Sequence, residues 1–90
     1  MLSEQVARLA ARGEWKDLSD FFEALEHYAS RRELHVARMV AVGFLLDLIE
    51  DLELIEADLR QCFNRLGSAS RKAWHEAYRD GHGGAEWPNS

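Results

Sequence analysis

A heptad pattern in the middle of the chain constrains the fold more than any other feature. Between residues 41 and 66, apolar positions alternate four and three residues apart without a miss. This spacing is typical of the seam along which helices pack in coiled coils. The seam consists of Ala41, Leu45, Leu48, Leu52, Ile55, Leu59, Cys62 and Leu66. It predicts one long helix at about residues 33–66, ended by Gly67 and roughly 50 Å in length at 1.5 Å per residue.

Shorter helices are predicted on both sides of the seam. Ser3 as N-cap and Gly13 as stop bound a first helix at about residues 4–12. A second helix is predicted to begin near Asp17 or Ser19, and its apolar side chains lie three and four residues apart as far as Ala29. These helices flank the long one and can cover part of its surface.

The remaining elements complete an all-α prediction. The apolar register breaks around Ser30-Arg31-Arg32, which indicates a turn or kink, although the pattern also allows a continuous helix there. A last short helix is predicted at about residues 70–79. One Pro, no Asn-Gly or Asp-Gly turn and no clean apolar alternation argue against strands. We expect a helical hairpin or small helical bundle built around the long helix.

Length and composition limit the kind of protein. Ninety residues are expected to form one domain or a piece of a larger assembly, and a single cysteine excludes a disulfide framework. We expect a helical domain at 1–80 and a flexible tail at 81–90. The longest apolar run, Met39 to Leu46, has eight residues, well below the roughly 18 to 20 of a membrane span. Without a signal-peptide pattern at the start, the expected location is the cytoplasm.

The first half of the predicted long helix is apolar on nearly all sides, and such a helix must be buried on nearly all sides. A second apolar stripe beside the seam consists of Met39, Val42, Leu46 and Ile49. A second chain is the simplest cover for it, which predicts a homodimer, most commonly through a two-fold antiparallel helix pair. In the alternative, a monomeric bundle, the short first and last helices cover the stripe.

The second half of this helix is acidic. Its six acids are Asp47, Glu50, Asp51, Glu53, Glu56 and Asp58, and no Lys or Arg occurs from Met39 through Leu59. A solvated helix face is the simpler interpretation, but such faces usually interleave charges of both signs. The functional interpretation is an electronegative ridge that docks on a basic partner, with Leu54 projecting from it. We predict that Asp47, Glu50, Asp51, Glu53, Leu54 and Asp58 bind this partner.

The sequence predicts no catalytic, metal or cofactor site. Its four histidines are scattered, no two of them lie four residues apart, and no glycine-rich phosphate loop is present. Cys62 lies on the seam, so we expect a buried and unreactive thiol.

Two further features concern the C-terminal part of the chain. The last helix is mildly basic through Arg71, Lys72, His75 and Arg79, but Glu76 and Asp80 offset these charges, and direct nucleic-acid binding is not expected. Trp87 lies outside any amphipathic pattern and is interpreted as a loose tail residue or as an anchor in a partner pocket.

These observations predict a small non-catalytic intracellular protein, an adaptor, chaperone-like or regulatory protein, that binds a basic protein partner. The alternative is an acidic inhibitor that mimics nucleic acid, such as a phage anti-defence protein. Its carboxylates would occupy phosphate positions on a basic groove, so its binding would be competed by DNA or RNA.

Overall fold

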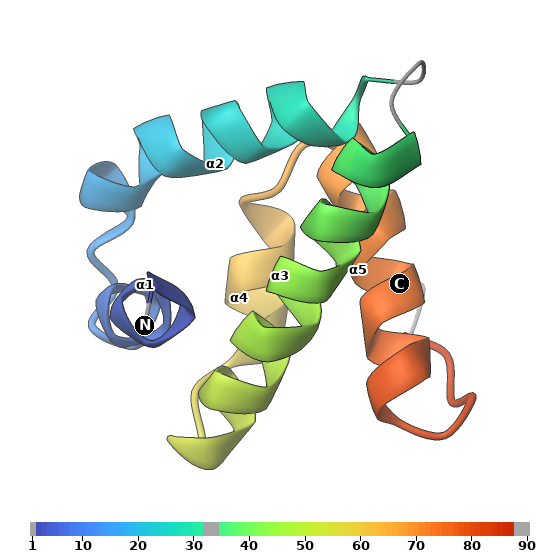
Figure 1. Cartoon of the computed structure of the whole chain (residues 1–90). Helices are drawn as coiled ribbons and strands as arrows, with labels where there is room; N and C mark the ends of the chain where they lie inside the picture. Colours follow the sequence, from blue (N-terminus) through green and yellow to red (C-terminus); the bar gives the residue numbers. More distant parts are fainter. Residues whose placement is uncertain (1, 32–34, 88–90) are drawn as a thin grey trace.

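The computed structural model describes residues 2–31 and 35–87, and these form five α-helices without a strand. The small all-α bundle predicted from the sequence is therefore confirmed. In Figure 1, α2 crosses one end of the bundle while α3 and α5 run side by side. The helices are α1 (Leu2–Ala11), α2 (Trp15–Ala29), α3 (His35–Leu54), α4 (Leu59–Asn64) and α5 (Ser68–Gly81).

The first half of the seam forms the centre of the core. Ala41, Leu45, Leu48 and Leu52 on α3 are almost completely buried. Around them pack apolar side chains from α1, α2 and α5, chiefly Val6, Ala10, Leu18, Phe22, Leu25, Ala73, Trp74 and Ala77. The short helices therefore cover much of α3 within one chain.

The predicted helix at 33–66 is interrupted, and its continuity to Leu66 was a wrong prediction. α3 ends at Leu54. Beyond it, the N–H of Glu56 donates to the carbonyl of Glu53 (3.1 Å), and the N–H of Ala57 donates to that of Leu52 (2.9 Å). Glu56 has φ 56°, in the left-handed region. This pair of hydrogen bonds is a Schellman motif, which satisfies the last carbonyls of a helix and ends it.

The acidic side chains explain where the helix breaks. The last turn of α3 contains no basic residue, and carboxylates near a helix C-terminus oppose the helix dipole. The same charges favour the start of a new helix. Asp58 is the N-cap of α4, and its side chain accepts a hydrogen bond from the N–H of Arg60 (2.9 Å). Cys62 and Leu66 then return to the core from α4 and the turn after it.

A carboxylate on α2 caps the start of α5. The N-cap residue Gly67 has no side chain, and Glu26 accepts hydrogen bonds from the N–H groups of Ala69 (3.0 Å) and Ser70 (2.8 Å). Burial alone would raise the pKa of Glu26, but these hydrogen bonds outweigh it and lower the pKa. A Cβ at position 67 would overlap the Glu26 side chain, so a larger residue there would have to displace this carboxylate from its capping position.

The position of Trp87 shows that its interpretation as a loose tail residue was wrong. Its side chain is only 7% exposed and lies in the core. The ring contacts four side chains, those of Phe63, Trp74, Tyr78 and Arg60. Trp87 therefore packs as an anchor against side chains of its own chain. The division at residue 80 and the flexibility of the tail stay predictions, and residues 88–90 lie outside the described part.

The structure separates the second and third helices. α2 ends at Ala29, the N–H of Ser30 donates to the carbonyl of Glu26 (3.0 Å), and α3 begins at His35. Arg32, part of the predicted turn, lies outside the described residues. Within the part of the chain that the structure describes, no helix has the length and apolar character needed to cross a membrane.

Candidate functional site

α3 ends in two exposed apolar side chains. Leu54, its last residue, is 80% exposed, and Ile55, at the start of the turn, is 48% exposed. We call these two residues the apolar tip. The sequence placed Ile55 on the buried seam, but the break after Leu54 turns the backbone and brings it to the surface. Leu54 projects from the surface of the helix, as predicted.

Acidic residues surround the apolar tip. Glu50 and Glu53 precede it on α3 and are exposed, Asp51 is half-buried, and Glu56 and Asp58 are exposed on the turn. Asp47 lies further up α3 and is also exposed, so water can solvate its carboxylate without a cationic partner. The acids predicted for partner binding are therefore brought together with Leu54, and binding by them stays a prediction.

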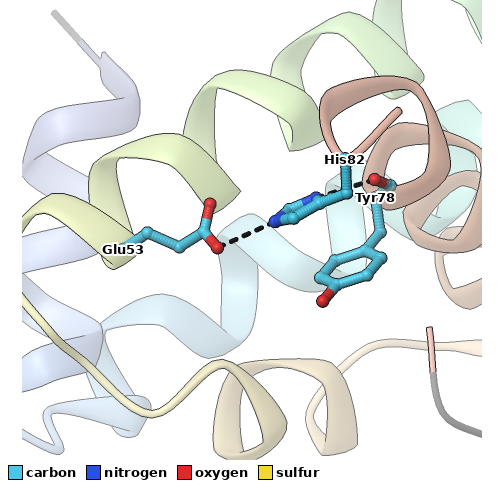
Figure 2. A network of polar contacts seen from close by, with 3 residues as sticks. All are labelled: Glu53, Tyr78 and His82. Atoms are coloured by element: carbon cyan, nitrogen blue, oxygen red, sulfur yellow. Dashed lines mark hydrogen bonds and ion pairs between the residues drawn. The ribbon is translucent and has the colours of Figure 1, made fainter. Parts of the chain in front are cut away.

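Two of these acids already bind groups within the chain. Asp58 caps α4 through the N–H of Arg60. Glu53 binds His82 at the end of α5, with 2.8 Å between Glu53 Oε2 and His82 Nε2 (Figure 2). The remaining four acids give this surface its negative charge: Glu50, Asp51 and Glu56 beside the tip, and Asp47 further up α3.

His82 joins the ends of α3 and α5, a link that no sequence pattern predicted. Its Nδ1 lies 2.8 Å from the carbonyl of Tyr78, and its ring stacks on the Tyr78 ring with centroids 3.9 Å apart (Figure 2). Only the protonated imidazole donates from both ring nitrogens. The hydrogen bond to Glu53, followed by that to the Tyr78 carbonyl, therefore raises the pKa of His82.

This link predicts a pH dependence of stability. A histidine whose pKa is higher in the folded state contributes stability below its unfolded pKa and loses it as pH rises through the folded pKa. We expect the thermal midpoint to fall between about pH 6 and pH 8, the range in which histidine titrates. His82→Gln should flatten this slope, measured by circular dichroism, whereas His27→Gln on the exposed face of α2 should not. Equal slopes in His82→Gln and the unmodified protein would contradict the assignment.

A shallow cleft of about 190 Å³ adjoins the apolar tip. It lies between α1 and the end of α3, and Arg8 contributes the basic side chain of its lining. The residues that line it are Glu4, Ala7, Arg8, Asp51, Leu54 and Ile55. A partner that covers Leu54 therefore also has room to place an apolar side chain against Ala7. No sequence pattern predicts this cleft, because it depends on how α1 packs on α3.

Comparison of the chain with models of protein families, with curated proteins and with solved structures finds no match. The apolar tip combines exposed apolar surface, surrounding negative charge and an adjoining cleft.

The predicted self-association stripe is only partly at the surface. Ile49 is completely buried, so its assignment to a surface for a second chain was wrong: it faces the core. Met39 is 62% exposed, and Val42 and Leu46 are half-buried. Two neighbours extend the stripe outward, because Val36 is 68% and Val40 52% exposed. The homodimer itself stays a prediction.

The thiol of Cys62 and the basic side chain of Arg71 make contacts typical of structural residues. Cys62 is buried, and burial raises its pKa to about 12, as expected for an unreactive thiol. On the mildly basic α5, Arg71 donates to the carbonyl of Asn64 (3.1 Å) and packs over Phe63. Among the described residues, no three His, Cys, Asp or Glu side chains gather as metal ligands would.

Proposed function

We propose that this protein is a small non-catalytic binding module that docks on another protein through the apolar tip and its surrounding acids. The partner carries an apolar notch for Leu54 and a basic rim for Glu50 and Asp51. One observation carries the proposal: Leu54 and Ile55 are 80% and 48% exposed at a site where six acids fall between residues 47 and 58. An adaptor or a chaperone-like or regulatory protein inside the cell would use such a surface.

The two kinds of side chain have different roles in this binding. Burying Leu54 and Ile55 is worth about 1.5–3 kcal/mol for each fully covered side chain. Association costs about 4–15 kcal/mol in lost freedom, so the apolar tip alone does not hold a partner. The acids supply long-range attraction and orientation toward a basic surface. The cleft beside Arg8 adds apolar contact area.

Nucleic-acid mimicry is the second candidate, favoured by the absence of any Lys or Arg from Met39 through Leu59. A mimic would present its carboxylates freely to a basic groove. Here Glu53 is bound to His82 and Asp58 caps α4, and an apolar pair lies among the acids. These contacts support the protein-binding module over the mimic.

The proposal is tested by capture of partners from native lysate. Glu50→Lys with Asp51→Lys should abolish capture, because it places cations against a basic rim. Asp20→Lys with Glu23→Lys, an equal change of charge on exposed positions of α2, should retain it. If the variant with lysine at positions 50 and 51 still captures the partner, these acids do not bind it. Release of the partner by added DNA or RNA would favour the nucleic-acid mimic.

A further inference from the structure

A second surface, formed by the first half of α3 and by α5, lies apart from the apolar tip at the end of α3. It is a groove of about 500 Å³ whose apolar lining comes from α3. The exposed side chains of Val36 and Val40 continue this apolar surface beside the groove. The residues that line the groove are Arg38, Met39, Val42, Gly43, Leu46, Glu76 and Asp80.

The two ends of the groove differ in charge. α3 and α5 run in the same direction (Figure 1). Arg38 binds Glu76 near one end of the groove, and Leu46 packs at Gly81 near the other. Lys72 lies close to Arg38 at the first end. The acids near this end already bind other groups: Glu76 binds Arg38, and Glu26 accepts hydrogen bonds from the start of α5. The other end carries Asp80.

Asp47 on α3 adds to the acidic end. It follows Arg38 by nine positions, or about 13 Å along a helix. Along the groove, a cation therefore precedes an acid on both helices: Arg38 precedes Asp47 on α3, and Lys72 precedes Asp80 on α5, where Arg79 is a further exposed cation.

Gly43 lies on the exposed side of α3, in the interior of the helix. Glycine is less favourable than alanine at such a position. No atom of the described residues outside its own turn comes within 4 Å of the place where its Cβ would be. Packing within the chain therefore does not explain the glycine, whereas close approach of another helix to this face would use the missing side chain.

We propose that a second copy of this chain docks on the groove in an antiparallel, two-fold arrangement. Met39 and Val40 pack against the same residues of the other copy, and Gly43 allows the helices to approach. The two-fold axis places the Lys72 end of each copy beside the Asp80 end of the other. A uniformly basic partner would be repelled by Lys72 and Arg38 at one end of the groove. An inverted copy of the chain instead places opposite charges against each other at both ends, which favours self-association. This dimer goes beyond the proposed function and leaves the apolar tip free.

Sedimentation equilibrium tests the dimer directly. Between about 1 and 100 µM protein, the apparent mass should rise from 10.3 kDa toward twice that value. Met39→Glu should keep the protein monomeric with an unchanged helical spectrum, because Met39 is 62% exposed in the single chain. The control is Leu54→Glu, which changes an exposed leucine in the apolar tip and should leave the dimer intact.

A charge exchange tests the antiparallel orientation. Lys72→Glu and Asp80→Lys should each raise the dimer Kd by about tenfold or more, because like charges then face each other. The two substitutions together restore opposite charges across the two-fold axis and should recover the original Kd. A monomer at the highest concentration, a dimer that tolerates Met39→Glu, or a double variant weaker than both single variants would each overturn the proposal.

Discussion

Replacing Trp87 with Ala is expected to lower the free energy of unfolding by about 3 kcal/mol, at the lower end of the range for buried tryptophans. The indole is 7% exposed and packs against Phe63, Trp74 and Tyr78, with ring centroids 5.0 to 5.4 Å apart. A domain of this size has about 5–13 kcal/mol of stability in total, so the loss would be a large fraction. Urea denaturation followed by circular dichroism measures it.

The control for this variant is Trp87→Phe. The indole N–H of Trp87 has no hydrogen-bond partner among the described residues, so phenylalanine loses no hydrogen bond there. We expect a cost of about 1 kcal/mol from the smaller ring. A Trp87→Ala variant as stable as the unmodified protein would mean that the segment after α5 does not pack on the bundle in solution.

Cys62 is expected to react with a thiol reagent at least about a thousandfold more slowly in the folded protein than in the unfolded chain. Burial raises the pKa of its thiol from 9.0 to about 12. With that pKa, the fraction of reactive thiolate at pH 8 is on the order of a thousandfold lower than in the unfolded chain. The side chain is also 0% exposed, which blocks approach of the reagent. Labelling at pH 8, with and without denaturant, measures the ratio.

The two predictions are coupled through the same aromatic cluster. Phe63 follows Cys62 on α4 and contacts Trp87, with ring centroids 5.4 Å apart. Trp87→Ala should therefore speed the labelling of Cys62 by loosening α4, whereas Leu54→Ala at the exposed tip should not. Fast labelling of the folded, unmodified protein would show that α4 does not hold Cys62 in the core.

The sequence predicted the first half of the seam correctly and its continuity incorrectly. From Ala41 to Leu52, burial on one face dominates, and a helix is the structure that places these residues together. From Leu52 to Leu66 the same spacing continues, but it is produced by two helices and a turn. A spacing pattern records which residues reach the core, and it does not record how the backbone brings them there.

Two signals in the sequence opposed the long helix. Acids crowd the end of α3 without a nearby cation, and Asp58 is a favourable N-cap residue. The residue that completes the break is Glu56, which adopts the left-handed conformation with φ 56°. A glutamate in the sequence does not predict that conformation. The packing of α1 on α3 and of Trp87 on α4 depends on tertiary contacts that no local pattern contains.

The candidate site was predicted in part. The acids and Leu54 follow from composition and from the helical face, and they lie together in the structure. Ile55 joined them only because the helix ends, while the Glu53–His82 link and the cleft beside Arg8 arise from folding. Ile49 shows the converse: a position on an apparent outer stripe is buried because neighbouring helices cover it.

The most direct test of the protein-binding account is the affinity of the captured partner for Leu54→Ala. The account predicts a loss of about 1–2 kcal/mol, a Kd five- to thirty-fold higher, because Leu54 is the most exposed part of the apolar tip. Met39→Ala, at an exposed apolar position in the groove between α3 and α5, should bind the partner as the unmodified protein does. Equal affinity of Leu54→Ala and the unmodified protein would contradict the account.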